Sequence, residues 1–289
     1  KEVAMTESEL RQIGGASDEF VFDLELELSV DPIDSVLFDD DSLYYSDTRY
    51  LSNSNMGRME DDVHIFYQYL RGEYKYDTRI LAFVIGRLAH VLALEPEKQF
   101  DFHIVDVKGR RTQKFTEAQE VHGFDWTVTK DEFLKCQAMA NAFVAADGIE
   151  QLLAESEKEK PFVGYDPFGY GIPVKGKLDI FTPKDLTYGK SIGDLKTTAK
   201  RMQDFPFSVP KYDYDRQAAM YMSLSGANAM RFFPVSKTDG HAVGEFIIER
   251  DSKTFQQGMW KYEQSIEKFH RLYVEGKYRP DYLYTKKLR

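Results

Sequence analysis

The chain reads Gly176-Lys177-Leu178-Asp179-Ile180-Phe181 and, fifteen residues after that aspartate, Gly193-Asp194-Leu195-Lys196-Thr197. Both segments have strand-like composition, and turn-forming residues lie between them, which predicts a hairpin. Because side chains alternate between the faces of a strand, Asp194 and Lys196 share a side, and Asp179 joins them there if the strands pair. Two carboxylates beside an ammonium can hold a hard divalent cation and direct an activated water at a phosphodiester. A surface hairpin with a cross-strand salt bridge would account for the same three residues.

The bulk composition indicates a globular protein. The chain has 289 residues, of which 42% are hydrophobic and 30% are charged, and this length can bury a sizeable core. No run of about 18 apolar residues occurs and no signal-peptide pattern is seen at the start, so we expect a cytoplasmic protein that does not associate with membranes. Cys136 is the only cysteine, which excludes an internal disulfide and a multi-cysteine metal centre.

The net charge of −10 is concentrated at one end of the chain. Residues 1–43 hold 13 Asp and Glu but only Lys1 and Arg11, a charge of −11, so residues 44–289 sum to +1. We therefore expect an acidic extension over 1–43, as a docked strand or a flexible arm, and a main domain over 44–289. A near-neutral domain can still carry a basic groove, because phosphate binding depends on where Lys and Arg are placed.

Hydrophobic periodicity predicts an α/β fold with a central mixed sheet flanked by helices. Residues 100–128 are predicted to contain only short strands and loops. Strands are expected around 172–196, 231–235 and 242–248. Helices are expected over 56–70, 79–94, 130–157 with a break at Gly148, 214–224 and 252–274.

Polar and aromatic side chains on two predicted helices could complete a site. Gln217 and Tyr221 are four residues apart, so they share a helix face and could orient the lysine or contact a phosphate. His90 could supply a neutral imidazole to an Mn²⁺ or Mg²⁺ shell made mainly of oxygens. Tyr212 and Tyr214 could stack on unpaired bases. Each of these residues, taken alone, is explained as simply by packing or solvation.

The order of these motifs resembles that of a known family. The chain carries Gly-x-x-x-His ending at His90, then Leu94-Glu95-Pro96-Glu97, Gly-Lys-Leu-Asp ending at Asp179, Gly-Asp-Leu-Lys-Thr-Thr, and Tyr-Asp-x-Gln-x-x-x-Tyr ending at Tyr221. This order is similar to that of RecE-type exonucleases of the PD-(D/E)xK nuclease superfamily, over roughly residues 44–289. The resemblance implies a PD-(D/E)xK, restriction-endonuclease-like core, and hence a nuclease domain at 44–289. Iron–sulfur relatives with this core need four cysteines, which this chain does not have.

The resemblance also implies a metal site. His90, Asp179 and Asp194 would ligate the ion together with the backbone carbonyl of Leu195. The expected cofactor is Mg²⁺, and Mn²⁺ should substitute for it. Lys196 would position or deprotonate the attacking water and stabilise the charged phosphate. The implied catalytic set is Lys196, Asp179, Asp194, Gln217 and Tyr221.

The implied activity is digestion of linear double-stranded DNA from its 5′ ends, which leaves 3′ single strands for recombination. Expected partners are DNA ends, a single-strand annealing protein and further copies of the chain in a ring. The alternatives are an endonuclease on the same core and a non-catalytic DNA-binding or scaffold protein. Residues 1–43 could also act by themselves as an interaction module.

Recognition of a DNA end requires groups that bind phosphate. Ser52 and Ser54 stand at a predicted helix start, where free N–H groups can bind an anion. Ordinary helix N-capping is the simpler interpretation of both serines. The further candidates for contacts with the DNA backbone are Arg58, Lys200, Arg201 and Lys211.

Overall fold

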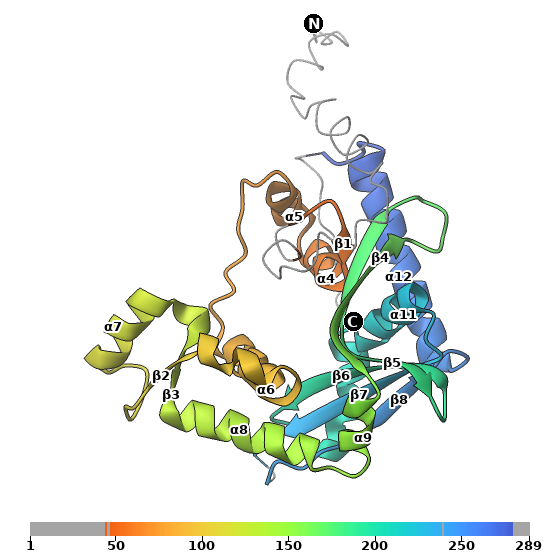
Figure 1. The fold of residues 1–289 in the computed structure, drawn as a ribbon. Coiled ribbons are helices and arrows are strands. Elements are labelled where there is room, and N and C mark those ends of the chain that lie inside the picture. The colour runs from red at the N-terminus through yellow and green to blue at the C-terminus, as the bar shows by residue number, and fades with distance from the viewer. Residues whose placement is uncertain (1–43, 45–46, 239, 280–289) are drawn as a thin grey trace, which may run out of the picture. The chain divides into compact units, whose positions relative to one another are not determined.

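The computed structural model describes residues 44, 47–238 and 240–279, and they divide into two compact units (Figure 1). Unit 1 contains the described residues up to Tyr74, Val163–Lys175, and those from Tyr262 onward. Unit 2 contains Lys75–Phe162 and Gly176–Lys261. In these ranges no helix is both long and apolar enough to cross a membrane. The predicted acidic extension at 1–43 lies outside the described residues.

Unit 2 is built on a mixed β-sheet. Strands β5 (Pro173–Asp185) and β6 (Gly189–Thr198) form an antiparallel hairpin. Strand β6 runs parallel to β7 (Ala229–Ser236), which is antiparallel to β8 (Phe246–Glu249). Strand β4 (Glu157–Tyr165) pairs with β5. The first residues of β5 and the last of β4 belong to unit 1.

Helices cover both faces of this sheet (Figure 1). On one face α6 (Leu81–Leu94), α8 (Lys130–Val144) and α9 (Ile149–Ala154) bury an apolar cluster that includes Leu195 and Phe233 from the strands. The predicted fold class, a central mixed sheet flanked by helices, is therefore confirmed.

The other face is covered by α11 (Tyr214–Ser225) and by the first turns of α12 (Lys253–Phe269). Ile192 and Phe232 of the sheet are fully buried beneath these helices. Burial of such large apolar side chains contributes about 1.5–3 kcal/mol each. The sheet that carries the predicted Asp-x-Lys motif is thus fixed between two apolar layers.

The hairpin between β5 and β6 has a specific local cause. Asp185 Oδ1 accepts hydrogen bonds from the backbone N–H groups of Thr187 (2.8 Å) and Tyr188 (3.0 Å). Its Oδ2 accepts one from Ser191 Oγ (2.6 Å), and Gly189 adopts a φ of 72°. Aspartate and glycine are the residues that stabilise such turns most readily. The predicted hairpin is present.

Gly193 sets the spacing of the sheet immediately before Asp194. A Cβ at this position would lie 2.9 Å from the Phe233 ring and 3.1 Å from Ile180 Cβ. Any other residue would therefore push β6 away from the neighbouring side chains, and the motif requires glycine here.

The prediction of a single helix over 56–70 is wrong, because the structure has two helices there, both in unit 1. Helix α4 (Asn53–Asp61) ends and α5 (Val63–Leu70) begins at Asp62, whose backbone is extended. The Asp62 carboxylate accepts hydrogen bonds from the first N–H groups of α5. An aspartate that caps a helix in this way interrupts the preceding one.

Two further elements differ from the expectation. The helix predicted to reach residue 157 ends at Ala154 and is followed by strand β4. Residues 100–128 contain, besides short elements, the helix α7 (Gln113–His122), whose N-cap is Thr112. Both segments are rich in polar residues and carry little hydrophobic periodicity, which is why the pattern did not reveal them.

Unit 1 also holds β1 (Leu51–Ser52), which pairs with Val174 and Lys175 of β5. The buried Lys175 ammonium donates to the backbone carbonyls of Tyr44 and Asp47, so it ties this strand to the start of the described chain. The remaining short elements are η2 (Pro96–Asp101), β2 (His103–Val105), η3 (Phe124–Trp126), β3 (Thr127–Thr129), η4 (Met202–Phe207), α10 (Ser208–Lys211) and the π-helical η5 (His270–Val274).

Candidate functional site

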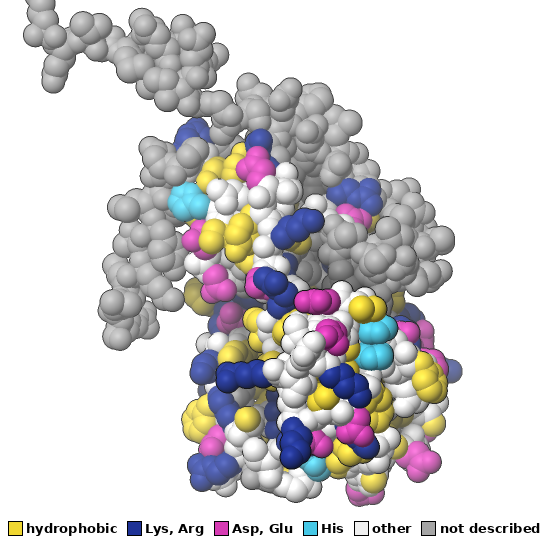
Figure 2. All heavy atoms as spheres, turned by 90° about the vertical axis from the view of Figure 1, so that its left-hand side faces the viewer, with side chains coloured by type: hydrophobic (Ala, Val, Ile, Leu, Met, Phe, Trp, Pro, Cys, Tyr) yellow, Lys and Arg dark blue, Asp and Glu magenta, His cyan; other side chains and the backbone are white. Residues whose placement is uncertain are grey.

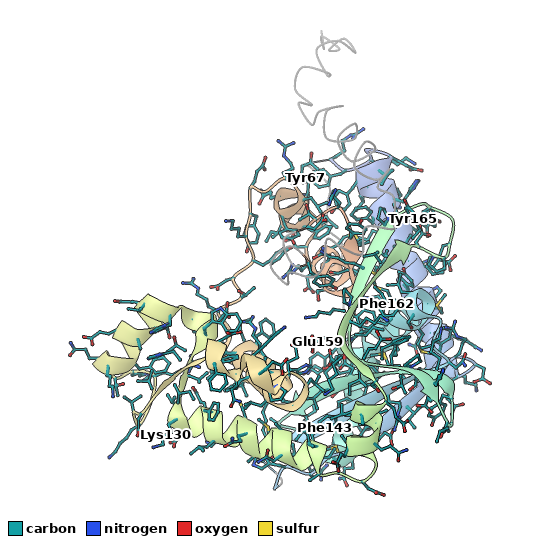
Figure 3. The ribbon with its side chains drawn as sticks, in the orientation of Figure 1. Tyr67, Lys130, Phe143, Glu159, Phe162 and Tyr165 are labelled. Carbon is teal, nitrogen blue, oxygen red and sulfur yellow. The ribbon has the colours of Figure 1, made fainter. Side chains whose placement is uncertain are left out.

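Acidic, basic and imidazole side chains converge on one face of unit 2. His90 comes from α6, Asp179 from β5, and Glu159 from β4, where Figure 3 labels it. His90 Nδ1 lies 3.4 Å from Asp179 Oδ2 and 4.0 Å from Glu159 Oε1. These three residues offer ligand atoms that all lie within 4.8 Å of one another. Helix α6 and the strands β4 and β5, which lie far from it in the sequence, therefore build one polar centre.

The backbone of β6 enters the same centre at Leu195. Its carbonyl oxygen lies 2.5 Å from His90 Nε2, and its N–H donates to Asp179 Oδ2 at 2.9 Å. The structure thus places the carbonyl that the resemblance implied as a ligand beside the imidazole and one carboxylate. The buried Leu195 side chain packs into the core on the α6 side, which holds this peptide in place.

Asp194 and Lys196 form the adjoining half of the centre. Lys196 Nζ lies 2.7 Å from Asp194 Oδ2, and Gln217 Nε2 donates to Asp194 Oδ1 at 2.7 Å. Asp194 is 4% exposed and Gln217 is 8% exposed, so this hydrogen bond is shielded from water. Gln217 therefore orients the carboxylate, not the lysine.

Tyr221 occupies a different place from Gln217 although both share a face of α11. Its ring lies so close to the backbone of β5 that a Cβ at Gly176 would be 2.8 Å from Tyr221 Cε1. Gly176 is therefore the glycine that lets the tyrosine cover the strand three residues before Asp179. The ring supports the backbone that carries the carboxylate.

Glu159 was missed by the sequence reasoning. It lies on an edge strand that also contains Pro161, and strands with proline and alternating charges give a weak pattern. Its φ of 49° is unusual for a residue other than glycine, and strain of this kind tends to accumulate at functional sites. The sequence did contain one signal, on the partner strand β5. Lys177 lies two residues before Asp179 and so shares its face of the strand, and its Nζ lies 3.0 Å from Glu159 Oε2.

The electrostatics of the centre follow from its crowded carboxylates. Burial alone would lower the pKa of His90, but the charges of Asp179 and Glu159 raise it to about 9. Burial, together with the charges of Asp194 and Glu159, raises the pKa of Asp179 to about 7 against the opposing effect of His90. Burial would also lower the pKa of Lys196, yet Asp194 and Asp179 raise it, so the ammonium stays charged.

This donor set fits a divalent cation. Asp194 is buried, and its Oδ2 lies 2.7 Å from Lys196 Nζ. A carboxylate oxygen has two lone pairs, so this contact leaves one of them available to a cation. Oxygen ligands with one imidazole suit Mg²⁺ and Mn²⁺. The acidic and histidine groups thus form a candidate metal site, with His90, Glu159 and Asp179 nearest to one another.

Binding of Mn²⁺ should weaken as the pH falls. A ligating imidazole must be neutral and a ligating carboxylate ionised, so the metal competes with the protons of His90 and Asp179. Metal binding displaces one proton, that of His90, between about pH 9 and 7, and a second, that of Asp179, below about pH 7. The dissociation constant should rise about tenfold per pH unit in the first range and more steeply in the second. Calorimetric titration with Mn²⁺ in buffers of different ionisation enthalpy counts these protons. An affinity independent of pH from 6 to about 8.5 would contradict this assignment.

The residues predicted to contact DNA phosphates lie in both units. In unit 1, Ser52 Oγ caps α4 by accepting from the Asn55 N–H (3.2 Å), Ser54 is exposed, and Arg58 donates to the Asn55 side chain (3.2 Å). The role of these residues in binding phosphate stays a prediction.

In unit 2, Arg201 pairs with Asp204 at 2.8 Å, which partly neutralises it. Lys200 donates to Ser208 Oγ at 3.1 Å. The ammonium groups of Lys200 and Lys211 lie 5.4 and 5.2 Å from the centre of the Tyr212 ring. The two lysines therefore gather at one aromatic side chain.

Comparison with known proteins adds a family and a fold. A family model described as a PDDEXK-like domain of unknown function (DUF3799) matches residues 54–283. None of the curated proteins matches the chain. A solved structure from Eubacterium rectale, named "Putative exonuclease", is 17% identical with a TM-score of 0.58, and the match covers 86% of this chain and 96% of that one. At this identity the likeness shows the fold alone.

A phage-related exonuclease from Haemophilus somnus 129PT is 13% identical, and the match covers 66% of this chain and 95% of that one. Its TM-score of 0.35 is too low to carry an argument.

Proposed function

Because the chain belongs to the family of PDDEXK-like domains of unknown function (DUF3799), we propose that it is a metal-dependent nuclease that digests linear double-stranded DNA from its ends. The observation that carries the proposal is the convergence of His90, Glu159, Asp179, Asp194 and Lys196 in unit 2. Three carboxylates and an imidazole can hold a divalent cation, and a charged lysine beside them can stabilise charge on a phosphate during metal-assisted hydrolysis.

The residues of the chain would divide the work as follows. His90, Glu159, Asp179, Asp194 and the Leu195 carbonyl are the candidate ligands. A bound divalent cation would lower the pKa of the attacking water and compensate the charge that develops on the phosphate. Lys196 keeps its proton, so it acts as a fixed positive charge toward the phosphate rather than as a general base.

Gln217 positions Asp194 in this mechanism through its 2.7 Å hydrogen bond. Tyr221 supports β5 at Gly176. Neither role requires contact with the scissile bond, so both residues are positioning residues.

Two observations support an exonuclease of the RecE type over other nucleases of this fold. The motifs that end at His90, Asp179 and Tyr221 follow the order of that family, and the structural relative from Eubacterium rectale carries an exonuclease name. We propose 5′→3′ polarity, 3′ single-stranded products, a ring of subunits and cooperation with a single-strand annealing protein as parts of the same function.

The distribution of surface charge agrees with attraction of DNA by a few basic side chains rather than by the net charge of the whole protein. Figure 2 shows Lys and Arg side chains interspersed with acidic and hydrophobic ones on one face of the molecule. Association should therefore depend on a few phosphate contacts and be sensitive to salt.

The decisive assay uses linear duplex labelled at either the 5′ or the 3′ end, with Mg²⁺, Mn²⁺ or EDTA. We expect early metal-dependent release of the 5′ label and retention of the 3′ label, because each strand should be shortened from its own 5′ end. Closed circular DNA is the control and should stay intact. Cutting of the circle would indicate an endonuclease on the same core, and no cutting of either DNA would leave a non-catalytic binding protein.

A further inference from the structure

The lysine of the candidate site is connected to a group of exposed residues. Lys196 Nζ lies 5.0 Å from the centre of the Tyr214 ring, and the rings of Tyr214 and Tyr212 are 5.7 Å apart. Tyr214 also packs on Phe232 and Phe205 of the core. Tyr214 thus links the site to Tyr212, whose side chain is 50% exposed.

Two cations flank Tyr212. The ammonium groups of Lys200 and Lys211 lie 5.4 and 5.2 Å from the ring centre. Neither forms an ion pair with a residue that the structure describes, and Lys200 donates to the hydroxyl of Ser208. An exposed ring with two ammonium groups close to it matches the chemistry of a nucleotide, which has a flat base and a phosphate.

The turn that presents Tyr212 is held rigidly. Asp213 has a φ of 53°, which is costly for a residue with a side chain. Lys261 of α12 offsets this cost by donating to Asp213 Oδ1 at 2.8 Å and by pairing with Asp215 Oδ2 at 2.9 Å. Helix α12 approaches so closely that a Cβ at Gly258 would be 2.1 Å from the Asp215 carbonyl oxygen.

We infer that Tyr212, Lys200 and Lys211 form a platform on which an unpaired nucleotide of the strand being cut stacks its base. This inference rests on the proposed function and specifies how that site holds its substrate. The two steps of 5.0 and 5.7 Å place the platform about three nucleotides or fewer from Lys196, at roughly 3.4 Å per nucleotide along a strand. A base stacked there holds the frayed strand next to the site.

The test measures binding of a fluorescent ten-nucleotide oligothymidine in EDTA, where metal-dependent cutting is absent. An abasic oligonucleotide of the same length and charge is bound in parallel. Tyr212→Ala should weaken binding of the thymidine oligonucleotide roughly 5- to 100-fold and leave binding of the abasic one unchanged. Tyr212→Phe should keep wild-type affinity because it keeps the ring.

Lys200→Gln and Lys211→Gln should weaken both oligonucleotides equally, and each should reduce the salt slope by about 0.7. The matched controls are Phe100→Ala, an aromatic side chain that is 85% exposed, and Lys135→Gln, an exposed lysine on α8. Both controls should bind like wild type.

The platform is refuted if Tyr212→Ala binds like wild type, or if it weakens both oligonucleotides alike, since that would indicate a structural defect. Absence of wild-type binding at low salt would refute it as well. The outcome separates from that of the proposed function. If the protein cuts duplex ends at a rate that does not depend on Tyr212, only the platform is refuted. If it shows the base-dependent binding but never cuts DNA, only the proposed nuclease activity is refuted.

Discussion

Lys196→Ala should reduce metal-dependent DNA digestion by at least about 100-fold, the effect typical of removing one electrostatic stabiliser of a transition state. The side chain is a permanent cation 2.7 Å from Asp194, and its raised pKa means that its charge is present at every working pH. Its loss removes a positive charge that no described neighbour can replace at that point.

The same substitution should leave metal binding intact. All the candidate ligands remain, and removal of a nearby cation makes the site more attractive to Mn²⁺. For this variant we therefore expect a titration to show intact Mn²⁺ binding and the digestion assay to show a reduced rate. Lys184→Ala, an exposed lysine on the same hairpin, is the control and should digest DNA like wild type. Lys196→Ala protein that still digests DNA at the wild-type rate would remove Lys196 from the mechanism.

Glu159→Gln should weaken Mn²⁺ binding by at least about tenfold and reduce digestion at low metal concentration. The substitution keeps the size of the side chain but removes a charged oxygen ligand from the group that includes His90 and Asp179. Digestion should recover at high metal concentration, because Lys196 and Asp194 are unchanged.

Glu157→Gln is the matched control for this prediction. Glu157 lies two residues earlier on β4 and pairs with Lys160, and its side chain is 51% exposed. It should bind Mn²⁺ with wild-type affinity, measured by the same titration. If both variants bind equally tightly, Glu159 is no ligand and its contact with Lys177 is structural.

The sequence by itself predicted the fold class and several of the residues that the structure brings together. The strand period placed Asp194 and Lys196 on one face, and the turn residues around Asp185 predicted the hairpin that the structure contains. These are local properties, since strand alternation and turn chemistry depend on neighbours within a few residues. The motif order added His90, which the structure places beside Asp179.

Other features depend on contacts between distant segments, and only the tertiary structure reveals them. Glu159 joins the site because an edge strand with a proline pairs with β5, and its sequence carries almost no strand pattern. Gln217 holds Asp194 rather than Lys196 because of the way α11 packs on the sheet. Tyr212 is exposed while Tyr214 is packed, although only one residue separates them in the chain. Local sequence fixes which way a side chain points from its own strand or helix, but packing decides what it meets.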